Sequence, residues 1–96
     1  MSLFVVQHQH AAEACPAGDP QMAPMLLTHL APSNAEQYGV NIHSHGVVDG
    51  AHQLVLIVDA EDGAAVEKYM SPFAMAGSVE VLPASSCEAV VARAAC

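Results

Sequence analysis

The dipeptide Asp49-Gly50 lies between two runs of strand-forming residues, and it is the feature that most constrains the fold. The runs cover Val40–Val48 and Ala51–Asp59 and are rich in β-branched and other apolar residues. Asp-Gly is favoured in two-residue hairpin turns because it tolerates a positive φ at both central positions. The sequence therefore predicts an antiparallel hairpin here. With this turn, the expected pairs are Val48 with Ala51, Val47 with His52 and His45 with Leu54.

Strand and helix patterns alternate along the rest of the chain. Apolar residues recur at helical spacing in two segments, and β-branched residues concentrate near both ends of the chain. The expected elements are strands at 3–10 and 77–83, helices at 20–30 (ended by Pro32) and 59–70 (ended by Pro72), a helical turn at 33–38, and a C-terminal helix in the tail, 84–96, opened by a Ser85/Glu88 capping box. The element order is then β-α-β-β-α-β with a helical tail.

This order predicts one α+β domain over residues 1–96 with a ferredoxin-like split βαβ arrangement. A right-handed crossover makes the first and second strands parallel and leaves the third between them, antiparallel to both. We therefore expect a four-stranded antiparallel sheet with helices on one face. The other face needs a partner, which favours a dimeric α/β barrel.

The composition and net charge indicate which classes of binding partner this chain can have. Of the 96 residues, 53% are apolar and only 12% are charged, which favours association into a homodimer. The net charge is −8, with Lys68 and Arg93 the only basic residues, which argues against nucleic acid and anionic membranes and favours a cation. The apolar runs are too short to span a bilayer, and no secretory signal is visible, so we expect a cytoplasmic protein.

Two His-x-His motifs suggest the chemistry. Side chains alternate along a strand, so His8 and His10 share a face with Phe4 and Val6. The expected hairpin pairing places three further histidines on one face: His43, His45 and His52. The ends of the first two strands and the start of the third meet at one rim of the sheet, and Cys15 leaves the first strand there. These side chains are therefore expected to approach one another.

Histidine and cysteine together favour a transition metal. Neutral imidazole suits zinc, copper, nickel and iron, and a thiolate adds preference for softer ions. The leading hypothesis is a small protein for metal sequestration, delivery or sensing. Its candidate ligands are His8, His10, His45, His52, His43 and Cys15. His29, by contrast, lies beside Met25 and Leu26 on a helix and is expected to be structural.

Two other functions stay open. One is a dimeric α/β-barrel enzyme, oxygenase- or isomerase-like, with a histidine or metal centre in a pocket on the open sheet face, where His8 and His45 would point into it and Phe73 could line it. The other is an interaction module whose histidines form a pH-dependent interface. Separately, Cys87 lies in the first turn of the C-terminal helix, where a lowered thiol pKa would make it a reactive thiol.

The stretch "HSHGVVDGAHQLVLIVDAEDGAAVEKYM" through "GSVEVLP" resembles the second half of small ferredoxin-like proteins, including a nickel-binding family and dimeric α/β-barrel domains. The resemblance covers about half of the chain as hairpin, helix and strand. It implies a homodimer and metal binding, but no ligand set transfers residue by residue. The tail "SSCEAVVARAAC" departs from the simplest members of this group.

Overall fold

The four strands form a single antiparallel sheet in this computed structural model, which describes residues 1–96. The strands are β1 (Ser2–His10), β2 (Val40–Val48), β3 (Gln53–Ala60) and β4 (Gly77–Ala84), in the spatial order β2-β3-β1-β4. β3 lies between β1 and β2 and is antiparallel to both. The predicted α+β class and four-stranded antiparallel sheet are therefore confirmed.

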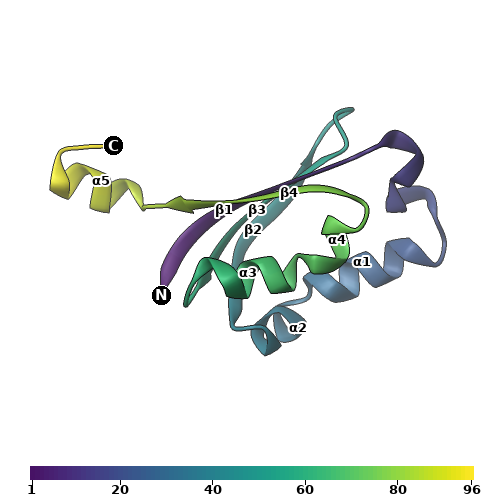
Figure 1. Ribbon diagram of the computed structural model, residues 1–96, viewed down its shortest axis with the longest axis horizontal. Helices are drawn as coiled ribbons and strands as arrows, with labels where there is room; N and C mark the ends of the chain where they lie inside the picture. The colour runs from purple at the N-terminus through teal and green to yellow at the C-terminus, as the bar shows by residue number, and fades with distance from the viewer.

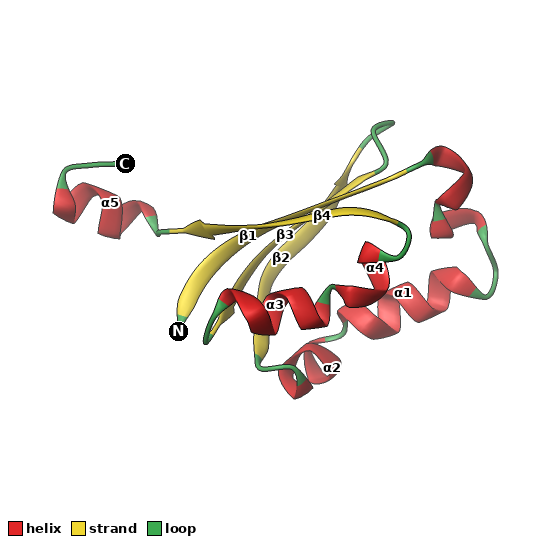
Figure 2. Cartoon of the chain, in the orientation of Figure 1, coloured by secondary structure: helices red, strands yellow, loops and turns green.

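Helices cover one face of this sheet (Figures 1 and 2). They are α1 (Met22–Leu30), α2 (Pro32–Gln37), α3 (Gly63–Tyr69) and α4 (Ser71–Ala74), and two short 3-10 turns, η1 (Ala12–Ala14) and η2 (Pro16–Gly18), join β1 to α1. α5 (Cys87–Arg93) projects beyond the end of the sheet, away from the other helices (Figure 1). No helix is both long enough and apolar enough to cross a bilayer.

Local sequence signals set the helix ends. The Asp62 side chain accepts a hydrogen bond from Ala65 N and begins α3. At the start of α5 this role belongs to Ser86, which accepts from Ala89 N, so the predicted cap at Ser85 is wrong by one residue. Pro32 and Pro72 each fall in the first turn of a new short helix, because a proline there loses no hydrogen bond.

The core lies between the helices and the facing side of the sheet. Phe4, Val6 and His8 of β1 are buried, while the residues between them are only half-buried, as expected from side-chain alternation. The largest completely buried side chains are those of Tyr69 and Leu56. Only 13 of the 96 residues are buried, so this core is small and the rest of the structure depends on few contacts.

The opposite side of the sheet, which we call the open face, carries no helix (Figure 2). Ile57, Val5 and Leu82 form a row across its three adjacent strands, because Val5 pairs with both of the others. Leu3 and Val55 flank this row on the same side. Ile57 and Leu82 are 39% and 40% exposed. The open face therefore carries an apolar row that its own chain covers only partly, with the polar pair Gln7 and Glu80 beside it.

The hairpin exists, but its turn is longer than expected. Residues 49–52 form the loop, so Val47 pairs with Leu54 and His45 with Leu56. The predicted pairing of His45 with Leu54 is wrong, because Ala51 and His52 belong to the loop and do not extend β3. Gly50 takes a φ of 74° in this loop, as expected of the glycine, but Asp49 does not take the positive φ that a two-residue turn would need.

His29 helps to hold α1 against α3. Its ring stacks on that of Tyr69, with centroids 4.5 Å apart, and its Nε2 donates to Tyr69 O at 2.8 Å. The Asn34 amide donates to His29 Nδ1 at 3.3 Å, so both ring nitrogens have partners. The Tyr69 hydroxyl donates in turn to His29 O at 2.8 Å. The contacts agree with the structural role expected for His29.

Gly77 should not tolerate even a methyl group. A Cβ built at Gly77 would lie 1.9 Å from Gln9 O, whereas one built at Gly46 would meet nothing within 4 Å. We expect Gly77→Ala to lower the free energy of unfolding by about 1–3 kcal/mol or more, because β1 and β4 must separate. The matched variant Gly46→Ala should stay within about 0.5 kcal/mol. Urea denaturation of both variants checks this, and equal stability would contradict it.

Tyr69 should titrate only in strong alkali. Burial, followed by the proximity of Tyr38, raises the pKa of Tyr69 to about 12 from its ordinary value of 10.0. The unfolded chain loses this proton first, so the stabilisation is complete below pH 10 and is lost as the pH rises toward 12. Tyrosinate absorbance should show a step near pH 12 that Tyr69→Phe abolishes. A variant that keeps this step would contradict the assignment.

Candidate metal centre

Three segments meet at one rim of the sheet and build the site. They are the end of β1, the hairpin loop at residues 49–52 and the start of β4. His10 N donates to His52 O at 3.2 Å, and the Gln9 side chain donates to Ala51 O at 2.6 Å. On the other side of β1, His10 pairs with Gly77. The position of His10 is thus fixed from both neighbouring segments.

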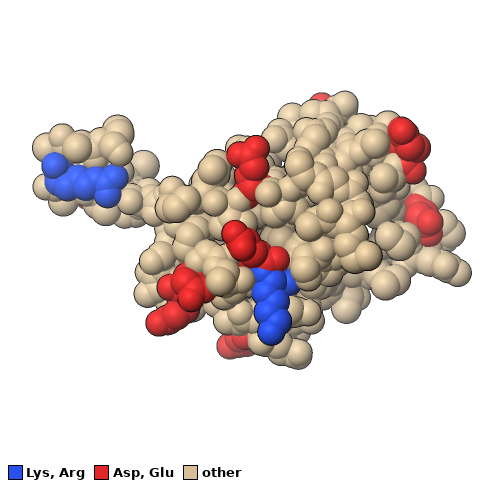
Figure 3. Space-filling view, in the orientation of Figure 1, with Lys and Arg blue, Asp and Glu red and all other residues tan.

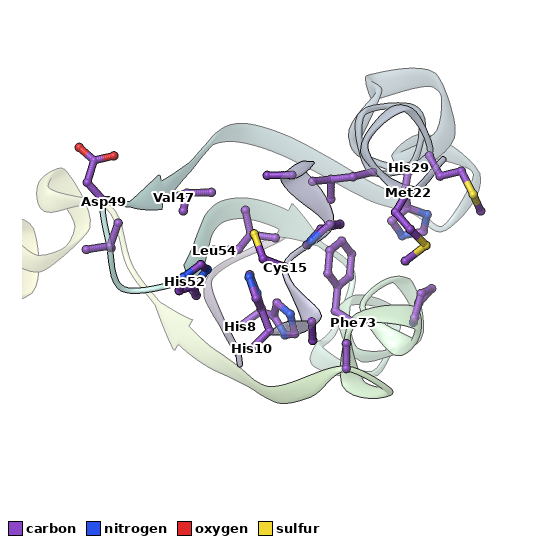
Figure 4. A pocket seen from close by; sticks show the side chains of 18 of the residues that line it. His8, His10, Cys15, Met22, His29, Val47, Asp49, His52, Leu54 and Phe73 are labelled. Carbon is purple, nitrogen blue, oxygen red and sulfur yellow. The ribbon is translucent and has the colours of Figure 1, made fainter. Parts of the chain in front are cut away.

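His10, Cys15 and His52 form the candidate metal-binding cluster. One ligand atom from each residue lies within 4.8 Å of those of the other two. The rings of His10 and His52 have centroids 5.3 Å apart, nearly perpendicular to each other. Cys15 reaches this place from the junction of η1 and η2, directly after β1 (Figure 4). The rim therefore offers two imidazoles and one thiol to a single point.

His10 is unusual because neither of its ring nitrogens has a hydrogen-bond partner, although both are buried. A buried polar group without a partner costs about 1–3 kcal/mol. Burial lowers the pKa of His10 below its ordinary value, and the nearby His8 and His52 lower it further. The ring is therefore held in its neutral form, which is the form that binds a metal ion.

His8 lies next to the cluster and is bound to the sheet. Its Nδ1 lies 2.9 Å from Ser78 O, and since a carbonyl can only accept, Nδ1 carries the proton. In the neutral ring Nε2 then has a free lone pair. The His8 ring is 5.3 Å from that of His10 and meets the edge of Phe73 at the same centroid distance. In this form the Nε2 of His8 can accept a hydrogen bond or a proton beside the cluster.

His52 has a left-handed backbone, with a φ of 52°. This conformation is uncommon for residues other than glycine, and histidine is among the types that tolerate it best. It turns the chain from the hairpin loop into β3. The same turn brings the His52 side chain beside His10, so the strained residue is one of the three candidate ligands.

His43 and His45 do not join this cluster. A register shift between Ile42 and Ser44 leaves His43 without a pairing partner, and its Nε2 bonds to the Asp59 carboxylate at 2.6 Å. His45 is exposed and lies opposite Leu56, two residues further along β3 than expected. His43 is turned to the open face, where it meets Asp59, so the expectation that it shares a face with His52 is wrong. His45 keeps the expected face, opposite the buried Leu56, but it lies too far along β2 to join His10 and His52. The bulge and the longer loop are the physical reasons.

A cavity of about 470 Å³ adjoins the cluster (Figure 4). His8, His10, Cys15 and His52 line it together with apolar residues of the hairpin and the helices. Because His8 shares its side of the sheet with the buried Phe4 and Val6, the cavity lies on the helix-covered side. The cavity that His8 lines is therefore on the opposite side of the sheet from the open face, where a pocket with His8 and His45 was expected, and His45 does not line it. Phe73 does line the cavity.

Some parts of the site could not be read from the sequence. The Gln9 amide fixes the hairpin loop, and Gly77 allows β4 to approach β1. Glutamine within a strand and glycine at its start are too common to signal these roles. Cys87 is exposed on α5 and is not among the residues that line this cavity, so its reactivity stays a prediction.

Comparison with known protein families places the chain in one of them. The family described as "Domain of unknown function (DUF3303)" matches residues 3–95. The chain belongs to the DUF3303 family. No curated protein and no solved structure shows significant similarity to it. The match includes all four strands and all three residues of the cluster.

Proposed function

We propose that this DUF3303 protein binds a transition metal ion through His10, Cys15 and His52. The observation that carries the proposal is the His10 ring, whose two buried nitrogens have no partner beside a thiol and a second imidazole. A bound ion would satisfy one of these nitrogens and remove part of the cost of burying them.

The geometry is compatible with such an ion. Nitrogen and sulfur ligands of zinc lie about 2.0–2.3 Å from the metal, which puts tetrahedral donors about 3.5 Å apart. The three donors already lie within 4.8 Å of one another, so small side-chain rotations would close the site. Two nitrogens and one sulfur suit zinc and copper best, with nickel and iron as further candidates.

Three protein ligands leave a fourth position open, which permits exchange of the ion or binding of another molecule. We therefore propose a role in metal sequestration, delivery or sensing. A reducing compartment such as the cytoplasm would keep Cys15 a free thiol. The chain has only two Lys and Arg residues, and their side chains lie in separate places (Figure 3). This supports a function that does not involve binding to nucleic acid or to anionic membranes.

We also propose that the protein forms a homodimer of the ferredoxin-like α/β-barrel type. The open face presents the row of Ile57, Val5 and Leu82, which a second copy could cover. α5 has seven residues, none of them buried, and Val91 is 78% exposed. A helix this short is not stable in water without packing. Contacts from a partner would supply that packing.

The cavity supports a second candidate function, an enzyme. A space of about 470 Å³ is suited to an organic substrate, and the Nε2 of His8, whose Nδ1 is bonded to Ser78 O, lies beside the cluster. An isomerase- or oxygenase-like reaction would use this cavity in place of the open face. Turnover of an organic compound by the metal-loaded protein distinguishes it from a protein that only binds metal.

Zinc binding should depend on the three cluster residues. We expect His10→Ala, Cys15→Ser and His52→Ala each to weaken zinc binding at least about 100-fold, because each removes one of three metal bonds. His43→Ala and His45→Ala are matched controls outside the cluster and should stay within about twofold. Competition titration with a chromophoric chelator, on protein purified without a His tag, measures this.

Cobalt substitution provides an independent reading. Bound Co²⁺ should show a thiolate-to-metal charge-transfer band that Cys15→Ser removes. Wild-type protein that takes up no zinc or cobalt, or controls that lose as much affinity as the cluster variants, would reject the proposed site. Metal at 100 times its Kd should also stabilise the fold by about 2.7 kcal/mol.

Charges on the open face should separate the dimer. The wild-type chain should have twice its monomer mass of 9.9 kDa in light scattering. Ile57→Lys combined with Leu82→Lys should give monomers, because two ammonium groups would be buried in an apolar interface. Leu27→Lys is the control, since Leu27 is 67% exposed on the helix-covered side. A monomeric wild-type protein at micromolar concentration would contradict the proposal.

A further inference from the structure

The cavity beside the cluster is much larger than a metal ion requires. Its volume of about 470 Å³ is roughly three times that of the ~150 Å³ protein cavity known to hold one benzene molecule. Ligand pockets for small organic molecules start at about 300 Å³. The space therefore fits a molecule of about two fused rings together with a polar group.

One wall of the cavity is apolar, and the polar atoms lie at the other end, at the cluster. Met22, Met25 and Leu26 of α1 contribute apolar surface, and so do Leu54 and Phe73. Methionine side chains adapt well to flat aromatic molecules because they are unbranched and polarizable. His29 also lines the cavity, but both of its ring nitrogens already have partners. Free polar atoms are therefore concentrated at the cluster, and the α1 wall is apolar.

The charges exclude several ligand classes. Neither Lys68 nor Arg93 lines the cavity, and the one acidic residue that does is Asp49 of the hairpin loop. A phosphorylated or multiply anionic ligand would find no cation to pair with here. A metal ion at the cluster would be the sole positive charge. A ligand with a single donor group directed at that ion fits this pattern.

We infer that the cavity binds a small aromatic molecule, neutral or singly anionic, whose oxygen or nitrogen head group occupies the open coordination position of the metal. Its ring system lies against the methionines of α1 and Phe73. This inference rests on the proposed metal site, and it adds the chemical class of the molecule that the site takes.

Three probes separate the contributions of head group and ring system. 2-Naphthohydroxamic acid carries both parts, acetohydroxamic acid has only the chelating head, and 2-naphthamide has the rings without the hydroxamate. We expect zinc-loaded protein to bind the first at least about tenfold more tightly than either of the others. Removing zinc should abolish the advantage over 2-naphthamide, because the two naphthyl probes differ only in the head group that binds the metal. Calorimetry measures the affinities after metal analysis has established the zinc content.

A matched pair of variants tests the apolar wall. Met25 and Leu27 lie on α1 and are 66% and 67% exposed, but only Met25 lines the cavity. Met25→Glu should weaken binding of 2-naphthohydroxamic acid at least about fivefold, because a carboxylate would be desolvated by the rings. Leu27→Glu should leave it unchanged. Zinc affinity in the absence of probe should be the same in both variants.

The outcomes are distinguishable. If zinc binds but the two hydroxamic acids bind equally well, the cavity contributes nothing and the inference is overturned while the metal site stands. The same holds if 2-naphthohydroxamic acid binds equally with and without zinc. If metal analysis finds no zinc, the proposed function fails, and the metal-anchored ligand fails with it.

Discussion

The pairing of β1 with its neighbours on both sides is the interaction on which the rest of the structure depends. β1 bonds to β3 along one edge and to β4 along the other, so its alternating side chains extend the core from Phe4 to His8. At the end of β1, His10 N donates to His52 O, in the loop just before β3. On the other side of β1, Gly77 of β4 lies close to the Gln9 backbone, so β1 still has a neighbour on both sides here. The backbone thereby carries a histidine out of the core to the rim of the sheet.

In the proposed metal site, this placement would exchange stability of the fold for the ability to bind an ion. An apolar residue at position 10 would avoid the cost of two buried nitrogens without partners. The left-handed His52 adds strain at the same place. Such local costs are common where a site is organised before its ligand arrives, because the ligand then supplies the missing contacts. In a domain with only 13 buried residues, these costs are a considerable part of the total stability.

The small core also leaves several large apolar side chains exposed. Helices cover one side of the sheet, and their contact with it opens into the cavity near the rim (Figure 4). The apolar row on the open face stays partly exposed, and α5 projects without burying a residue. A dimer through the open face would leave the cavity accessible, because the two lie on opposite sides of the sheet. The proposed metal binding and the proposed dimerisation would therefore respond to different substitutions.

The sequence alone determined the order of the strands and main helices, the antiparallel sheet with β3 between β1 and β2, and the position of His10 and Cys15 at one rim with His52. These follow from side-chain alternation and from local turn and capping signals, which act over a few residues. Only the tertiary structure decided the four-residue hairpin loop, the bulge at His43 and the placing of the cavity on the helix side. Pairing register depends on how the whole strand packs against its neighbours. A shift of two residues in β2 leaves each side chain on the same face of the sheet, so the alternation of side chains cannot reveal it. That shift separated His45 from the cluster and put Val47 opposite Leu54.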